Sequence, residues 1–262
     1  MNNFNKKSLG QNFLIDKNII NKILNLISIK NKNIIEIGPG KGALTDEILK
    51  KKPKSLISIE KDNLLSKELQ IKYKKNKTVK TLNKDFLKFN LEKLKIKKSI
   101  VIGNLPYNIS SQILVKIIRN NKWPPHFTDI VLMFQKELGE KILGEYQSNN
   151  YGRISILTNF RLQAVKKFYV SSNCFFPRPK VDSIVIHFKP KKKVNFIIKD
   201  LKNLEKVTNI LFSNKRKMIN KNIKKILNNN EIQMIRELDL QLRPSEIKPE
   251  IYYRIAELYE MR

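Results

Sequence analysis

The chain has few residues that could form disulfides or bind metals, and its apolar runs are short. Its 262 residues include one cysteine, Cys174, and two histidines, so it can form no internal disulfide and offers no cluster for a structural zinc. Its longest clean apolar runs, such as 130–134, are far shorter than the roughly 18 residues of a membrane-spanning helix. The first ten residues show neither a secretory signal nor the arginines of a transit peptide. We therefore expect a cytoplasmic protein with no metal site and no membrane partner.

Acidic residues are also scarce. There are 23 Asp and Glu against 53 Lys and Arg, which gives a formal charge of +30. Such a surplus favours a polyanionic partner, and nucleic acid is the first candidate. The alternative is that the positive charge reflects a genome biased towards lysine and lies on solvent-exposed surface without a partner, because only 9 of the 53 basic residues are arginine. The charge is spread at similar density along the chain, so it indicates a class of partner without locating its surface.

Short apolar runs alternate with amphipathic stretches through the first two thirds of the chain. The runs predicted as strands cover 34–37, 55–60, 78–82, 99–103 and 129–134. Each is followed by 10–20 residues of helical character, for example 43–51 and 109–119, and this order is typical of a parallel sheet covered by helices on both faces. The sequence therefore predicts a doubly wound α/β domain.

The predicted sheet ends differently from how it begins. Two β-rich runs, 165–170 and 181–188, are separated mainly by 174–180, which is too short for a helical crossover, so they should pair antiparallel as a hairpin. A Pro/Lys-rich linker follows at 190–193, and beyond it apolar residues recur only at helical spacing. We expect two domains: residues 1–190, including an N-terminal arm and a helix over 17–27, and a small all-helical domain over 191–262.

A glycine-rich loop lies where the first strand turns into the first helix of the sheet. Gly38, Gly40 and Gly42 follow a G-x-G-x-G spacing at the crevice where α/β sheets bind ligands. Pro39 removes a backbone N–H that a pyrophosphate would need, which disfavours a nicotinamide dinucleotide. A tight turn without a ligand remains the alternative.

Two acids follow the next two strands. Glu60 ends the second strand, 20 residues after Gly40, where a carboxylate can accept hydrogens from both ribose hydroxyls. Asp85 follows the third strand, where it can accept from an adenine amino group. Either acid alone could equally be a helix cap or a solvated strand end. Together with the glycines, they predict an adenosine pocket without phosphate contacts.

The turn after the fourth strand carries the most specific signal. The amide oxygen of Asn104 and the backbone carbonyl of Leu105, held by Pro106, can both accept hydrogens from one exocyclic amine, and Tyr107 can stack on the ring that bears it. Such an amine is a poor nucleophile, because its lone pair is delocalised into the purine. Two acceptors in the plane of the ring can hold it so that the lone pair points out of plane. A surface turn with a capping asparagine is the alternative.

Asn-Leu-Pro-Tyr resembles the motif of amino-methyltransferases that use S-adenosylmethionine, and the chain as a whole resembles the ribosomal RNA adenine N6,N6-dimethyltransferase family. The resemblance extends over almost the full length and rests on these segments: 10–14, 36–45, Glu60, Asp85, 104–110, 135–137, 151–153 and 175–183. It implies a Rossmann-like methyltransferase sheet, the cofactor S-adenosyl-L-methionine, and a role in rRNA processing and ribosome biogenesis.

The resemblance also implies a role for each matching residue. The expected cofactor-binding residues are Asn12, Leu14, Gly38, Gly40, Glu60, Asp85 and Asn104. The expected catalytic residues are Asn104, Leu105, Tyr107 and Phe175, with Phe175 sandwiching a flipped adenine against Tyr107. Phe176, beside it, leaves an ambiguity of one residue. Direct transfer of a methyl group needs no general base beforehand, so neither histidine is assigned a catalytic role.

The family resemblance places an RNA-binding surface in the C-terminal domain. We expect Lys215, Arg216 and Lys217 to begin a basic helical segment that binds RNA, although a solvated helix face is the alternative. The expected partner is small-subunit (16S) ribosomal RNA within a pre-30S particle, bound by a monomer. Two adjacent adenosines in a hairpin near the 3′ end would be the targets.

Two other functions compete with this one. A related antibiotic-resistance methyltransferase acts on large-subunit (23S) RNA, but Leu105 and the segment 181–183 look more like the small-subunit branch. A non-catalytic nucleic-acid binder related to the family is the second alternative. The intact glycine loop, together with Glu60, Asp85 and Asn104, argues against it.

Overall fold

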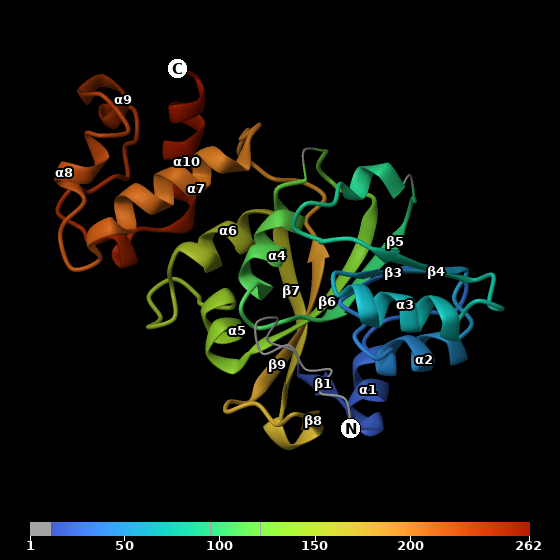
Figure 1. Cartoon of the computed structure of the whole chain (residues 1–262). Helices are drawn as coiled ribbons and strands as arrows, with labels where there is room; N and C mark the ends of the chain where they lie inside the picture. The colour runs from blue at the N-terminus through green and yellow to red at the C-terminus, as the bar shows by residue number, and fades with distance from the viewer. Residues whose placement is uncertain (1–11, 95, 121) are drawn as a thin grey trace. The chain divides into compact units, whose positions relative to one another are not determined.

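A seven-stranded sheet in the order β4-β3-β2-β5-β6-β9-β7 organises the chain, seen here in a computed structural model that describes residues 12–94, 96–120 and 122–262 (Figure 1). Strands β2 to β6 run parallel, and β9 runs antiparallel to β6. The strands are β2 Asn33–Ile37, β3 Ser55–Glu60, β4 Val79–Asn83, β5 Ser99–Asn104, β6 Phe127–Gln135, β7 Leu162–Val170 and β9 Ser183–Pro190. This confirms the doubly wound α/β fold.

Helices connect most of the parallel strands, because strands that run in the same direction need a crossover between them. The connecting helices are α2 Ala43–Lys50, α3 Asn63–Lys72 and α4 Ser110–Ile118; a short 3₁₀ turn, η2 Leu91–Leu94, follows β4, and α1 Lys17–Leu24 precedes β2. Asp16 and Asp62 cap α1 and α3 by accepting backbone N–H groups. The central strand β2 is buried from Ile34 to Ile37, as expected for a strand covered on both faces.

The end of the sheet is more elaborate than a simple hairpin. Strands β7 and β9 are neighbours, as the sequence predicts, and β9 inserts between β6 and β7. The segment between them contains η3 Ser172–Cys174 and β8 Phe175–Phe176. Strand β8 pairs antiparallel with β1 Phe13–Leu14 from the N-terminal arm. The N-terminal arm and the segment that contains β8, about 160 residues apart in sequence, therefore lie side by side.

The chain divides into two compact units, and the division differs from the predicted one. The first contains residues 1–114, 125–139 and 164–190, and the second contains 115–124, 140–163 and 191–262. The second unit includes the whole chain after residue 190, and α6 Arg153–Arg161 also belongs to it. The reason is tertiary: Tyr253 packs its ring on Phe160 and donates a hydrogen bond to the carbonyl of Ile156.

The second unit is helical after residue 191, as expected. Its further elements are α7 Leu201–Leu211, η4 Phe212–Asn214, α8 Asn220–Ile223, α9 Asn229–Gln233, η5 Pro244–Glu246 and α10 Pro249–Glu260, while α5 Lys136–Ile142 crosses the boundary between the units. The basic helix predicted from Lys215 begins later than expected, at Asn220 in α8. Residues 215–217 form a turn, and the Ile219 N–H that follows donates to the carbonyl of Leu242. Within the described ranges, every helix is too short or too polar to cross a bilayer.

Candidate active site

The glycine loop joins β2 to α2 in a backbone conformation that favours glycine. Gly38, Gly40 and Gly42 have φ angles of 65°, 58° and 83°, a region that side chains with a Cβ rarely occupy. A Cβ on Gly40 would lie 2.9 Å from the ring of Phe13. Phe13 therefore lies directly against the loop, and a side chain at Gly40 would displace either the ring or the loop.

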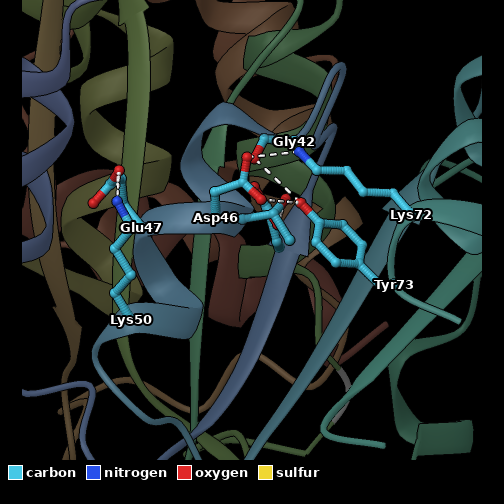
Figure 2. A network of polar contacts seen from close by, with 8 residues as sticks. Gly42, Asp46, Glu47, Lys50, Lys72 and Tyr73 are labelled. Carbon is cyan, nitrogen blue, oxygen red and sulfur yellow. Dashed lines mark hydrogen bonds and ion pairs between the residues drawn. The ribbon is translucent and has the colours of Figure 1, made fainter. Parts of the chain in front are cut away.

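A polar network behind the loop fixes its position (Figure 2). The Tyr73 hydroxyl donates to Asp46 Oδ1 at 2.8 Å and lies 3.4 Å from the carbonyl oxygen of Gly42. Lys72 Nζ pairs with Asp46 Oδ2 at 2.6 Å. Tyr73 and Lys72 belong to the end of α3, whereas Asp46 lies in the first turn of α2. The network thus ties α3 to the start of α2, where the glycine loop ends.

Glu60 accepts hydrogen bonds from the loop and from its own strand end. Its Oε2 accepts the N–H of Gly40 at 3.1 Å, and its Oε1 accepts the N–H of Asp62 at 2.8 Å. Burial raises the pKa of Glu60, and the two backbone hydrogen bonds oppose that effect. Each carboxylate oxygen has a second lone pair, so the side chain can still accept from a ligand's hydroxyl groups.

A second buried acid, Glu36, was not assigned a role from the sequence. It is 1% exposed, and its Oε2 accepts the hydroxyls of Thr45 at 2.7 Å and Ser58 at 3.1 Å. Burial, together with the nearby charge of Glu60, raises its pKa to about 7 against these two hydrogen bonds. Among the residues that the structure describes, its Oε1 has no hydrogen-bond partner, and Glu36 lines the pocket. The signal was present in the sequence, because an acid inside the apolar run 34–37 needs a reason to be buried.

The Asn-Leu-Pro-Tyr turn lies at the carboxyl end of β5. Asn104 Nδ2 donates to the backbone carbonyl of Asn12 at 3.1 Å, so the amide oxygen Oδ1 remains as an acceptor. Gly103 permits this arrangement, because a Cβ there would lie 2.6 Å from the carbonyl oxygen of Ile37. The arm residue Asn12 thus sets which way the amide of Asn104 faces.

Tyr107 is fixed from the opposite side of the turn. Its hydroxyl and that of Ser183 are 2.6 Å apart, and burial raises the pKa of Tyr107. Ser110 donates to the Tyr107 carbonyl at 3.1 Å as α4 begins. The side chain of Leu105, in the same turn, is buried. Its backbone carbonyl, rather than its side chain, is therefore the group that can contact a substrate. The ring of Tyr107 is therefore held in one orientation.

One pocket collects most of the predicted site residues. It encloses about 660 Å³, part of it open to solvent, and its lining includes Asn12, Leu14, Gly38, Gly40, Glu60, Asn104 and Leu105 together with Phe13, Glu36, Pro39, Lys41, Ala43, Leu44 and Pro106. Six of the seven predicted cofactor residues thus lie around one cavity. Residues 10 and 11 of the matching arm segment lie outside the described residues.

Asp85 is the predicted cofactor residue that does not line this pocket. Its carboxylate pairs with Lys61 at 3.0 Å and accepts the N–H of Leu87 at 2.9 Å. Burial acts to raise the pKa of Asp85, but Lys61 and the Leu87 N–H outweigh it and lower the pKa. The residue follows β4, whose Asn83 pairs with Glu60 in the sheet. Asp85 therefore lies near the rim of the sheet, and its carboxylate already forms an ion pair with Lys61.

The two adjacent phenylalanines of β8 have opposite environments. Phe175 is 3% exposed and belongs to the core cluster that contains Leu14, its partner in β1. Phe176 is 62% exposed and pairs with Phe13. Directly opposed residues of an antiparallel pair share one face, so Phe176 lies on the same face as Phe13. The predicted stacking residue Phe175 is packed in the core in this conformation.

One of the two histidines, His187, is buried in β9, and its Nε2 lies 2.8 Å from Asp129 Oδ1 in β6. The hydrogen bond from His187 lowers the pKa of Asp129. This pair joins two strands of the sheet and does not line the pocket.

Comparison with known proteins decides the family. The model of the family described as ribosomal RNA adenine dimethylase matches residues 1–260. The chain belongs to this family. It is therefore an RNA adenine methyltransferase that uses S-adenosylmethionine, as the sequence predicts. The sequence resemblance to the dimethyltransferase family is confirmed.

Individual relatives match over nearly the whole chain. The ribosomal RNA small subunit methyltransferase A of Pelagibacter ubique is 45% identical, covering 97% of both chains, and that of Mycoplasma mobile is 39% identical, covering 94% and 95%. Among solved structures, a dimethyladenosine transferase from Plasmodium falciparum has a TM-score of 0.74 at 24% identity, covering 93% of this chain and 95% of its own. That likeness supports the fold.

The pocket fits the cofactor of this family. The glycine loop offers open backbone, Glu60 has lone pairs for ribose hydroxyls, and the orphaned Oε1 of Glu36 can accept from an ammonium group. Pro39 offers no N–H to bind a phosphate, and S-adenosylmethionine carries no phosphate. A nucleoside with an amino-acid tail, and without phosphates, matches this donor and acceptor set.

The predicted RNA-binding residues belong to the second unit. Lys215, Arg216 and Lys217 are all exposed in the turn after η4. A turn of three exposed cations can follow a phosphate backbone. Their role stays a prediction.

Proposed function

We propose that the enzyme dimethylates the N6 amines of two adjacent adenosines in a hairpin near the 3′ end of 16S ribosomal RNA, acting on a pre-30S particle. The observation that carries the proposal is the Asn104 amide, whose nitrogen is held by the Asn12 carbonyl at the pocket. The names of the relatives support the small subunit as the target. We further propose that the protein acts as a monomer in the cytoplasm.

The residues of the turn can hold and orient the target amine. Asn104 Oδ1 and the carbonyl oxygen of Leu105 accept its two hydrogens, and Tyr107, fixed by Ser183, supports the ring. Bound S-adenosylmethionine supplies an activated methyl group beside this turn. After one transfer the amine keeps one hydrogen, so either acceptor can hold it again for the second. The released protons leave to water, which needs no histidine.

Stacking must offset the cost of extruding the adenine. Unstacking a base costs a few kcal/mol, and each aromatic stack returns roughly 1–3 kcal/mol. We retain Phe175 as the proposed partner of Tyr107 on the family resemblance. Because Phe175 is packed against Leu14 of β1, its use requires the β1–β8 pair to shift when RNA binds.

The stacking proposal is tested by comparing two neighbouring variants. Phe175→Ala should lower the rate of methyl transfer more than it lowers cofactor affinity, whereas Phe176→Ala should leave the transfer rate at saturating RNA close to that of wild type. Transfer rates and calorimetric cofactor affinities decide the matter. Loss of transfer in Phe176→Ala alone would assign the stack to the exposed ring.

The remaining proposed roles follow the site description. Asn12 and Leu14 cover the cofactor, Gly38 and Gly40 admit its methionine part, and Glu60 binds its ribose. Asp85 takes the adenine amine once its carboxylate is released from Lys61. The exposed turn 215–217 binds the RNA backbone.

The target is tested by offering both subunits. Labelled S-adenosylmethionine is incubated with the enzyme and with separately purified small and large subunits that lack these methyl groups, and the modified base is then mapped. The proposal expects label only in the small subunit, at two adjacent adenosines. Label in large-subunit RNA would favour the resistance-type activity instead, and no label in either would favour a non-catalytic binder.

A further inference from the structure

A set of exposed aromatic and basic side chains lies next to the target-amine site, in the first unit. It consists of Tyr169 at the end of β7, Lys136 at the start of α5, Phe176 in β8, and Arg178 and Lys180 in the segment between β8 and β9. We call these five residues the β7 rim. Tyr169 is 51% exposed and Phe176 is 62% exposed. None of them has a part in the pocket described above.

Hydrogen bonds and strand pairing join the rim to Tyr107 step by step. Tyr107 bonds to Ser183, which pairs with Gln135 at the end of β6. The next residue, Lys136, donates its backbone N–H to the carbonyl of Asp182 at 2.9 Å and places its Nζ 5.4 Å from the centre of the Tyr169 ring. A continuous series of contacts thus links the target-amine site to the β7 rim.

The segment between β8 and β9 is held in place rather than left loose. The Ser172 N–H donates to Asp182 Oδ1 at 2.9 Å, and Arg178 Nε donates to the Ser172 hydroxyl at 3.2 Å. The Asp182 carboxylate is therefore engaged with backbone, while Lys180 and Lys136 are exposed. The local balance of charge at the rim is positive.

This chemistry fits one class of partner. An exposed aromatic face binds an unpaired base, and neighbouring cations bind the phosphates on either side of it. Lysine at such density disfavours a protein interface, whose centre is usually depleted of it. We propose that the β7 rim binds the unpaired nucleotide next to the target adenosine, with Tyr169 stacking on its base and Lys136 and Lys180 contacting its flanking phosphates. The inference rests on the proposed function, because it assumes an RNA target at Tyr107.

The test uses the full-length enzyme with Tyr169→Ala, Tyr169→Phe and Lys180→Gln. The matched controls are Ile71→Ala and Lys75→Gln, two exposed residues at or after α3. Binding to a labelled 16S hairpin is followed by fluorescence anisotropy, turnover by methyl transfer to unmethylated small subunits, and cofactor affinity by calorimetry.

Tyr169→Ala should raise the Kd and the KM for RNA about tenfold, with kcat and cofactor affinity unchanged. Tyr169→Phe should retain the wild-type values because its ring still stacks. Lys180→Gln should weaken binding and reduce the slope of log affinity against log salt by about 0.7, as expected for one phosphate contact on a single strand. The controls should leave every value unchanged.

Two results would overturn the inference. One is a Tyr169→Ala variant that binds the hairpin as tightly as the Ile71→Ala control. The other is a defect seen only with intact particles and not with naked RNA, which would assign the rim to a protein contact. If the wild-type enzyme failed to methylate small subunits, the proposed function would fall, and the anisotropy measurement would still decide whether the rim binds RNA.

Discussion

The Glu36→Gln substitution should increase stability in a pH-dependent manner. Glu36 is buried, and its pKa is raised from 4.5 to about 7, chiefly by desolvation. The folded protein therefore holds this proton more tightly than the unfolded chain does. The stabilisation is fully present below pH 4.5 and is lost as the pH rises to 7. At about 1.4 kcal/mol per pH unit, the loss over this interval is roughly 3 kcal/mol.

Glutamine retains an oxygen that can accept from Thr45 and Ser58 and carries no charge. The free energy of unfolding of Glu36→Gln should therefore exceed that of wild type by up to roughly 3 kcal/mol at pH 8, and the two should converge near pH 4.5. Urea denaturation of both proteins at several pH values measures this difference, in which the titrating groups that do not interact with Glu36 cancel. A difference that is independent of pH would refute the reasoning.

The same substitution should weaken cofactor binding, because a neutral amide attracts an ammonium group less than a carboxylate does. Calorimetry at pH 8 measures this effect. Stability and affinity should thus move in opposite directions, as expected where a binding site keeps a buried charge at a cost to the fold. Unchanged affinity would remove Glu36 from the cofactor site.

Three further substitutions test the rest of the site. Asn104→Ala should abolish methyl transfer while leaving RNA binding within about twofold of wild type, because the acceptor it removes contacts the target amine and not the rest of the RNA; normal turnover would exclude that role. Tyr73→Phe should lower the free energy of unfolding by about 1–2 kcal/mol, since the hydroxyl donates to the Asp46 carboxylate, and denaturation curves matching wild type would show that the bond contributes nothing. Gly40→Ala should weaken cofactor binding at least tenfold, roughly 1.4 kcal/mol, because φ is positive and Phe13 blocks the Cβ; a calorimetric Kd equal to that of wild type would show that the loop can relax.

Local sequence patterns account for the sheet and for the placement of the glycine loop. The runs 34–37, 55–60 and 99–103 are apolar because these strands are covered on both faces, and residues at their carboxyl ends meet at one rim in any parallel sheet. This is why the sequence alone predicts that Glu60 and Asn104 lie at one pocket.

Contacts between distant segments could not be read from such patterns. Pairing of β1 with β8 buries Phe175 and leaves Phe176 exposed, although the two are chemically identical neighbours. The same limit applies to Asp85, whose partner Lys61 lies 24 residues earlier in the sequence, and to α6, which joins the second unit through Tyr253. In each case tertiary packing decided the outcome.

The most direct test of the account is a crystal structure of the enzyme with S-adenosylhomocysteine and a short RNA containing the target adenosine. We predict that the N6 nitrogen lies about 3 Å from Asn104 Oδ1, within hydrogen-bonding distance, with the adenine ring against Tyr107. An adenine bound elsewhere, or an N6 nitrogen turned away from Asn104, would contradict the account.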